Sequence, residues 1–256
     1  MQKYASYGDF AYIYDTLTDD VEYEKRAEYI TKLINTHLGR KPELLCDLGC
    51  GTGTILTILN AKGYDCIGID SSDTMLSVAS EKNTDGQVLY LNQDICSFEL
   101  YGTVDVFLSM LDTVNYITDK DDLDNMFKLI ANYLNPDGIF IFDINSKYKF
   151  EHVLGNNTYV YEKDNVFYTW ENYYEDGFLD FDINFFVKDD VNNYQRITEQ
   201  HSQRFYDLDF LKELADKHGL KTVAVYGDLR NNAPTDEEER IFVVMRKQAL
   251  DGKEIL

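Results

Sequence analysis

The sequence predicts an α/β protein: a doubly wound sheet of seven strands whose last strand is antiparallel, with a second, antiparallel β-sheet inserted. From Leu44 onward, short β-rich runs alternate with helical segments, a pattern typical of a parallel sheet with crossover helices. Over residues 151–205 aromatic residues become frequent and apolar residues recur at every second position, which indicates antiparallel strands. The polar loop at residues 227–239 is too short for a crossover helix, so the last two strands must pair antiparallel.

Each element of the α/β part has a local signal. The helix that follows the first strand ends near Gly63, and Ser71 or Ser72 would cap the next helix, which carries an apolar stripe. Residues 135–138 (NPDG) make a turn before the fifth strand, and Gly219 stops the last helix. The expected strands are residues 44–50, 65–70, 88–93, 104–110, 138–144, 222–226 and 240–246. The expected helices are residues 54–61, 72–82, 123–134 and 208–218.

Charge and composition narrow the function classes. The formal net charge is −22, from 46 acidic and 24 basic residues, and such a surface repels phosphate backbones. We therefore expect a neutral or cationic small molecule as partner and no nucleic acid. The longest apolar runs are far shorter than the ~20 residues of a membrane span, and the N-terminus lacks the apolar core of a signal peptide, so we expect no membrane association and a cytoplasmic location.

The four cysteines do not indicate a metal site or a disulfide framework. They form no C-x-x-C pair and have no accompanying histidine cluster. We expect Cys46, Cys50, Cys66 and Cys96 to be reduced and structural, and no metal to be bound.

The stretch DLGCGTG at residues 47–53 places three glycines at every second position, between a strand and a helix. A dinucleotide loop requires G-x-G-x-x-G, and Thr54 or Leu56 occupies the position of the third glycine in either register. Glycines at such a junction still let a ligand approach the backbone, and the helix start offers free N–H groups. Asp70, at the end of the second strand, can accept hydrogen bonds from both ribose hydroxyls of an adenosine.

These features together resemble the class I S-adenosylmethionine-dependent methyltransferases. The resemblance spans roughly residues 4–247 and includes residues 47–53, Asp70, residues 92–95 (NQDI), residues 136–145 (PDGIFIFDIN) and the final strand ending VVMRK. It implies a Rossmann-like sheet and S-adenosyl-L-methionine as cofactor. The N-terminal segment and the inserted sheet resemble the small-molecule N-methyltransferases.

The resemblance also implies roles for single residues. The glycines border the methionine portion of the cofactor, Asp47 holds its ammonium group and Asp70 takes the ribose. Asp94 and Ile95 read the adenine amino group, although Asp94 could instead be a turn residue. The implied cofactor-binding residues are Asp47, Gly49, Gly51, Gly53, Asp70, Ser71, Met75, Asp94, Ile95, Ser109, Met110 and Leu111.

Fewer sequence features indicate which residues contact the methyl acceptor. The candidate catalytic residues are Tyr14, Asp112, Asn115 and His201. Asp112 and Asn115 could instead cap the next helix, and His201 and its neighbour Arg204 could lie on the surface. The N-terminal aromatics Tyr7, Phe10, Tyr12 and Tyr14 would fold over the site as a lid or form a packing stripe.

The function that the sequence favours is methyl transfer to an amine nitrogen of a small molecule, because no strong general base for a hydroxyl acceptor is evident. The alternatives are a methyltransferase acting on RNA or protein, and a cofactor-binding module without catalysis. We expect residues 1–150 and 206–256 to form the cofactor-binding domain. The inserted sheet at residues 151–205 would cover the acceptor or mediate a homodimer contact.

Overall fold

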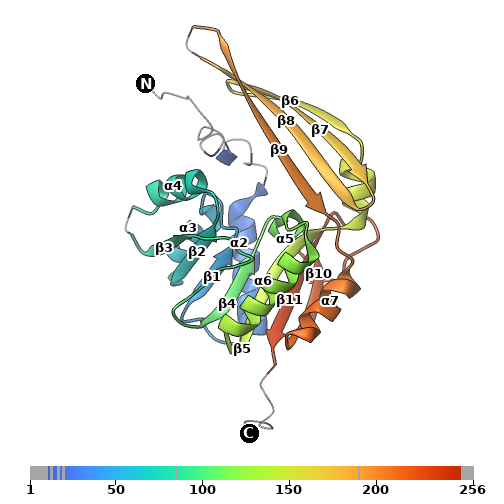
Figure 1. The fold of residues 1–256 in the computed structure, drawn as a ribbon. Coiled ribbons are helices and arrows are strands. Elements are labelled where there is room, and N and C mark those ends of the chain that lie inside the picture. Colours follow the sequence, from blue (N-terminus) through green and yellow to red (C-terminus); the bar gives the residue numbers. More distant parts are fainter. Residues whose placement is uncertain are drawn as a thin grey trace.

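The computed structural model describes residues 11, 14, 15, 18, 21–84, 86–189 and 191–248, which form two β-sheets with flanking helices (Figure 1). The first sheet has seven strands in the order β10-β11-β5-β4-β1-β2-β3, and the second has four in the order β6-β7-β8-β9. The strands of the first sheet are β1 (Leu45–Leu48), β2 (Cys66–Asp70), β3 (Val88–Asn92), β4 (Val104–Ser109), β5 (Leu134–Asn145), β10 (Leu220–Gly227) and β11 (Arg240–Lys247). Those of the second are β6 (Thr158–Lys163), β7 (Val166–Glu175), β8 (Phe178–Lys188) and β9 (Tyr194–Arg204).

The seven-stranded sheet is parallel except for β11, as the sequence predicts. β11 pairs antiparallel with β10 and with β5. It is the second strand from the edge, because β10 lies outside it. Residues 135–138, expected as a turn, form an irregularity in the pairing of β4 with β5, where Val104 pairs with Leu134 and Val106 with Ile139.

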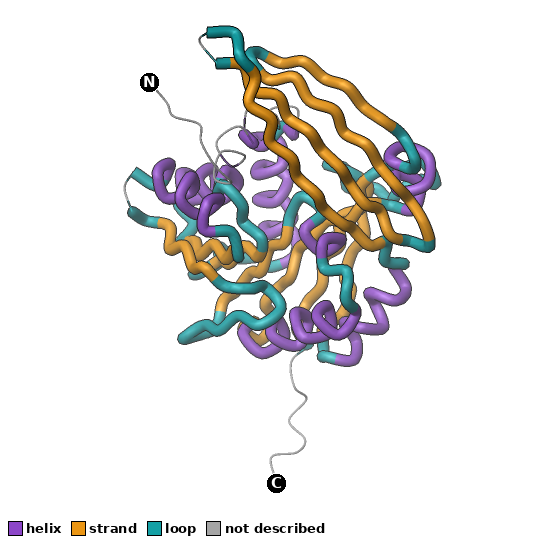
Figure 2. The backbone as a smooth tube through the Cα atoms, turned by 45° about the horizontal axis from the view of Figure 1, so that its top comes forward, coloured by secondary structure: helices purple, strands orange, loops and turns teal. Residues whose placement is uncertain are grey.

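Helices cover both faces of this sheet (Figure 2). They are α2 (Tyr23–His37), α3 (Thr54–Ala61), α4 (Asp73–Lys82), α5 (Thr113–Tyr116), α6 (Lys120–Tyr133) and α7 (Leu208–Lys217). Alternate residues of β5 enter different apolar clusters: Phe140 and Phe142 pack with residues of α6 and α7, and Ile139 and Ile141 with residues of α2 and α3. The sheet is therefore buried on both sides, which is the doubly wound arrangement.

Helix α2 is missing from the elements that the sequence predicts. Its buried residues include Ala27, Ile30 and Ile34, at the three- and four-residue spacing of an apolar helix face. The spacing of these apolar residues is the sequence signal for this helix, which lies after the aromatic residues expected to form a lid or a packing stripe.

The four-stranded sheet is an antiparallel meander that follows β5 through a short π-helix, η2 (Lys149–Leu154) (Figure 1). Its register places Trp170, Ile183 and Glu199 side by side across β7, β8 and β9, so these three side chains share one face. The described helices include none that combines the length and the apolarity needed to cross a membrane.

Candidate functional site

The three glycines of residues 47–53 have different surroundings. Gly51 has φ +54°, and a Cβ at this position would meet no atom within 4 Å. A Cβ on Gly49 would lie 2.4 Å from Cγ2 of Thr113, and one on Gly53 would collide with the Tyr90 ring. Gly49 and Gly53 therefore allow the loop to pack against α5 and β3, while Gly51 leaves backbone open to the cavity.

Asp70 connects this loop to the start of α4 through two hydrogen bonds. Its Oδ2 accepts a hydrogen bond from the Gly51 backbone N–H at 2.8 Å, and its Oδ1 accepts one from Ser72 N–H at 2.9 Å. Ser72 is the cap of α4, since its Oγ accepts from Met75 N–H at 3.3 Å. A carboxylate has about four acceptor positions, so Asp70 keeps acceptor capacity toward the cavity.

Asp47 lies at the end of β1 and is 2% exposed, and its Oδ1 has no hydrogen-bond partner within the described part of the chain. Burial, together with the charges of Asp70 and Asp143, raises the pKa of Asp47 to about 8. A buried carboxyl oxygen without a partner is costly unless a ligand donates to it. Asp47 thus fits a cationic or hydrogen-bond-donating group in the cavity.

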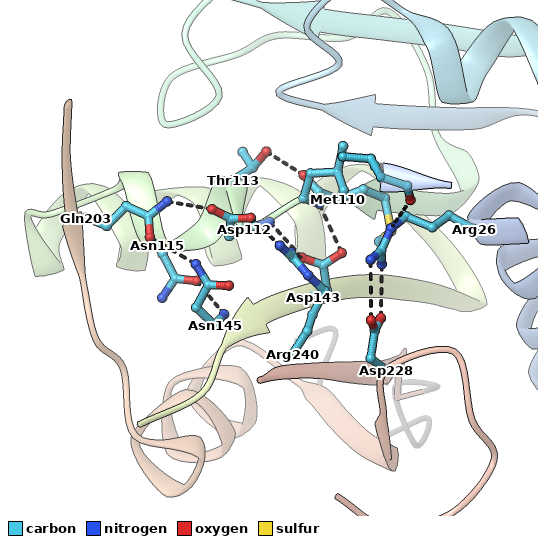
Figure 3. Close-up of polar contacts among 12 residues, drawn as sticks. Arg26, Met110, Asp112, Thr113, Asn115, Asp143, Asn145, Gln203, Asp228 and Arg240 are labelled. Atoms are coloured by element: carbon cyan, nitrogen blue, oxygen red, sulfur yellow. Dashed lines mark hydrogen bonds and ion pairs between the residues drawn. The ribbon is translucent and has the colours of Figure 1, made fainter. Parts of the chain in front are cut away.

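The loop after β4 takes an unusual backbone conformation, because Leu111 and Asp112 both have φ 57°. The carboxylate of Asp143 on β5 accepts both of their N–H groups, at 2.9 and 2.6 Å (Figure 3). Arg240 at the start of β11 joins this carboxylate to that of Asp112, at 2.5 and 2.7 Å. Two carboxylates and one guanidinium thus hold the loop in place.

Asp112, a candidate catalytic residue with a helix cap as its alternative role, occupies the cap position of α5, yet its side chain makes no capping hydrogen bond. Instead Gln203 of β9 donates to its Oδ2 at 2.5 Å (Figure 3). Burial would raise the pKa of Asp112, but the charges of Arg240 and Lys149 and the hydrogen bonds lower it below its usual value. Asp112 is therefore an ion-paired carboxylate, which is a poor proton acceptor.

Asn115 is fully buried and ties three elements together. Its Oδ1 accepts from Asn145 N–H on β5 at 2.9 Å, and its Nδ2 donates to the Arg204 carbonyl on β9 at 2.9 Å. Asn145 in turn donates to Oε1 of Gln203 at 3.0 Å. These contacts give Asn115 a role in joining the two sheets.

The described part of the N-terminal segment contacts the glycine loop. Asp15 accepts hydrogen bonds from Thr52 Oγ1 at 2.6 Å and from Thr54 Oγ1 at 3.3 Å, and it pairs with Lys82. Its neighbour Tyr14 lines the cavity, and burial, followed by the influence of nearby Tyr23, raises the pKa of Tyr14. The lid residues Tyr7, Phe10 and Tyr12 lie outside the described residues.

On the opposite wall, β9 presents His201 and Glu199, with 4.0 Å between His201 Nε2 and a Glu199 carboxylate oxygen. The His201 ring meets the Tyr116 ring edge-on at 5.9 Å. Burial lowers the pKa of His201, so the imidazole is neutral at pH 7, and burial also raises the pKa of Glu199. Arg204 turns away and donates to the Thr118 carbonyl at 2.7 Å.

One cavity of about 1500 Å³ joins the ends of β1, β2 and β4 to the inner face of the four-stranded sheet. The candidate residues that line it are Tyr14, Asp47, Gly49, Gly51, Asp70, Ser71, Met75, Asp94, Ile95, Met110, Leu111, Asp112 and His201. Gly53, Ser109 and Asn115 do not line it, and both Ser109 and Asn115 are fully buried. Asp94 accepts from Cys96 N–H at 2.8 Å, which makes it a turn residue that also faces the cavity.

Several residues of the site were not identified from the sequence. Asp143, Gln203 and Arg240 build the network around Asp112, and Lys149 of η2 lines the cavity. Burial, followed by the charge of Arg240, lowers the pKa of Lys149. Asp143 did carry a signal, since an acidic residue within an apolar strand run needs a buried partner.

Comparison with known proteins gives consistent results. A family model described as a methyltransferase domain matches residues 45–138. YqeM of Bacillus subtilis (strain 168), a protein named as a methyltransferase, is 32% identical over 247 residues, which is 94% of this chain and 97% of YqeM.

Solved structures agree with this result. An S-adenosylmethionine-dependent methyltransferase from Clostridium acetobutylicum ATCC 824 superposes with a TM-score of 0.86 at 34% identity, over 95% of this chain and 99% of that protein. The sugar N-methyltransferase KedS8 from Streptoalloteichus sp. ATCC 53650 has a TM-score of 0.79 at 16% identity, over 97% of this chain and 98% of KedS8. The likeness to KedS8 shows a shared fold.

Proposed function

This chain belongs to the S-adenosylmethionine-dependent methyltransferases, and we propose that it transfers the methyl group to an amine nitrogen of a small molecule. The observation that carries this proposal is the position of His201 and Glu199. Both line the same cavity as Gly51 and Asp70, and His201 Nε2 lies 4.0 Å from a carboxylate oxygen of Glu199.

The residues at the ends of β1 and β2 fit S-adenosylmethionine. The unpartnered Oδ1 of Asp47 suits the ammonium group of its methionine portion, and the open backbone at Gly51 allows that portion to lie close. Asp70 has acceptor capacity left for the ribose hydroxyls. Met75, Asp94 and Ile95 line the same cavity, and we assign them to the adenine.

The bound cofactor supplies an electrophilic methyl carbon next to its sulfonium. The chain must orient the acceptor nitrogen and exclude water, and orientation of this kind contributes on the order of 7 to 11 kcal/mol in favourable cases. Leu111, whose N–H donates to Asp143, and the neighbouring Met110 form a wall on the cofactor side.

A neutral histidine suits an amine acceptor. The His201 imidazole can take the proton that the nitrogen must lose, and the nearby Glu199 carboxylate stabilises the imidazolium that results. Asp112 is engaged by Arg240 and Gln203, so we assign it a role in holding the loop and not in proton transfer. Tyr14 lines the cavity and can contact the acceptor.

The four-stranded sheet would act as the acceptor cover, because its inner face supplies His201, Glu199 and Trp170 to the cavity. Residues 1–150 and 206–256 would form the cofactor-binding domain, and residues 151–205 would form the part of the chain that covers the acceptor. A homodimer contact through the outer face of this sheet and a cytoplasmic location stay predictions.

The proposal is tested by incubating the protein with methyl-labelled S-adenosylmethionine and a library of small amines, each matched by the corresponding alcohol. We expect label in N-methylated products and none in the alcohols. Transfer confined to alcohols, or to RNA or protein added in parallel, would overturn the assignment of the acceptor.

The Asp70→Ala variant provides the control. It removes the hydrogen bonds to Gly51 and Ser72, and we expect it to lose both label transfer and the rise in melting temperature that S-adenosylhomocysteine causes. The Asp73→Ala variant changes a neighbouring cavity-lining acid that contacts Asn92, and it should retain the rise.

A further inference from the structure

The inner face of the four-stranded sheet carries an aromatic surface around Trp170, the only tryptophan in the sequence. The Trp170 ring lies 5.6 Å from the Tyr159 ring on β6 and 5.6 Å from the Phe181 ring on β8. Trp170 and Phe181 both line the cavity, and they face the same side as His201 because Phe181 pairs with His201 in the register. We call Trp170 and Phe181 the ring platform.

The polar edge of Trp170 has no partner. Its Nε1 is buried and donates no hydrogen bond to any residue in the described part of the chain. A tryptophan N–H that is buried usually finds an acceptor, and leaving it without one is costly. A ligand that packs on this ring could supply the acceptor.

The register also fixes the spacing between the ring platform and the pair of Glu199 and His201. Trp170 pairs with Ile183, which pairs with Glu199, so Trp170 and Glu199 are two strands apart. Two strand spacings correspond to about 10 Å. Because the side chains of both residues extend into the cavity between these positions, a ring can lie beside Trp170 with its amine toward Glu199.

We propose that the acceptor carries its amine on a six-membered ring, directly or through one carbon, that the flat, apolar face of this ring packs against Trp170 and Phe181, and that the amine is directed to Glu199 and His201. The amine end of this assignment rests on the proposed function. Flat rings gain contact area and ring–ring attraction on an aromatic surface, and a cationic nitrogen is attracted to ring faces as well. An aryl ring and the C–H face of a six-membered sugar share this chemistry.

Because Trp170 is the sole tryptophan, its fluorescence reports directly on the ring platform. Benzylamine, glucosamine and the acyclic n-heptylamine are titrated into the wild-type protein with and without S-adenosylhomocysteine. We expect one or both ring amines to change the emission at concentrations at which n-heptylamine does not, and the stronger of the two identifies the source of the ring. An equal response to n-heptylamine, or no response to either ring amine, would overturn the proposal.

A variant pair tests the same point without fluorescence. Saturation-transfer NMR of the better ring amine is compared for Trp170→Leu and for Tyr173→Leu, which alters an exposed ring on the other face of β7. We expect an apparent affinity on the order of 10-fold weaker for Trp170→Leu and unchanged for Tyr173→Leu. Equal binding by the two variants contradicts the proposal.

The melting-temperature rise with S-adenosylhomocysteine separates the possible failures. If Trp170→Leu keeps that rise, the variant is folded and its cofactor site is intact, so a changed amine affinity belongs to the ring platform. If the wild-type protein shows no rise at all, the proposed function fails, while amine binding still decides whether the ring platform binds a ring.

Discussion

Gln203 on the four-stranded sheet donates a hydrogen bond to Asp112 on the loop after β4, and accepts one from Asn145 at the end of β5. Gln203 is 1% exposed, so its side chain is buried at both contacts. This one side chain connects the four-stranded sheet to the loop after β4, and both of these line the cavity. Figure 3 shows Gln203 and Asn145 beside Asp112 and Asp143, where the two sheets meet.

Replacing Gln203 by leucine leaves the Nδ2 of Asn145 and the Oδ2 of Asp112 without this partner. We expect the free energy of unfolding to fall by about 1–3 kcal/mol, measured by chemical denaturation. Gln195→Leu, at the exposed end of the same strand, is the matched control and should change it little. Equal effects of the two substitutions would show that the buried contacts of Gln203 do not contribute to the free energy of unfolding.

Asp143→Asn removes the charge that accepts from Leu111, Asp112 and Arg240. The amide presents an N–H group where only donors face it, so we expect a loss of about 3 kcal/mol or more in stability. The loop residues with φ 57° lose their anchor, and the affinity for S-adenosylhomocysteine, measured by calorimetry, should fall as well.

The control for this change is Asp137→Asn, on an exposed position of the same strand, where asparagine tolerates the observed φ of 62°. It should leave stability and ligand affinity near the wild-type values. Unchanged ligand affinity in Asp143→Asn would contradict a role of this anchor in shaping the cofactor side.

Alanine at Gly49 and at Gly51 should have different effects. Both substitutions add about 1–2 kcal/mol of left-handed backbone strain, but only Gly49→Ala also places a Cβ 2.4 Å from Thr113. We expect thermal melts to show the larger loss of stability for Gly49→Ala. Gly51→Ala, whose Cβ enters open space, should mainly reduce the melting-temperature rise with S-adenosylhomocysteine. A full rise in Gly51→Ala would mean that the ligand does not approach this backbone.

The affinity for S-adenosylhomocysteine should depend on pH through Asp47. In the free protein its pKa is about 8, and an ammonium group bound beside it favours the ionised form and lowers that pKa. Below pH 8 binding therefore releases a proton, and affinity rises with pH by up to about tenfold per unit until it levels off above 8. Calorimetry in buffers of different ionisation enthalpy counts the protons released.

The Asp47→Asn variant should bind more weakly and lose this pH dependence. The Asp47 carboxyl also makes the stability of the ligand-free protein depend on pH. Because its folded-state pKa lies above the unfolded value near 3.9, its contribution to stability is present below that value and is lost as pH rises through about 8. A ligand affinity that is flat between pH 6 and 8 in the wild type would exclude Asp47 as the partner of the ammonium group.

Much of the fold could be predicted because its signals are local. The alternation of strands and helices, the Ser72 cap and the reversed last strand follow from residues close in sequence and from the length of one loop. The position of β11 between β5 and β10 could not be predicted in this way, because strand order depends on which edges meet after the chain has folded.

In the site, too, some features follow from local sequence and others depend on the tertiary structure. By itself the sequence determined a glycine-lined strand end followed by Asp70, because backbone freedom and strand-end chemistry are properties of a few adjacent residues. Only the tertiary structure decided that Arg240 pairs with Asp112 and Asp143, which lie 128 and 97 positions away from it in the sequence. It also decided that Gln203 joins the two sheets and that Trp170 faces the same cavity as His201. Charge pairing and burial depend on distances in space, and spacing along the chain does not encode them.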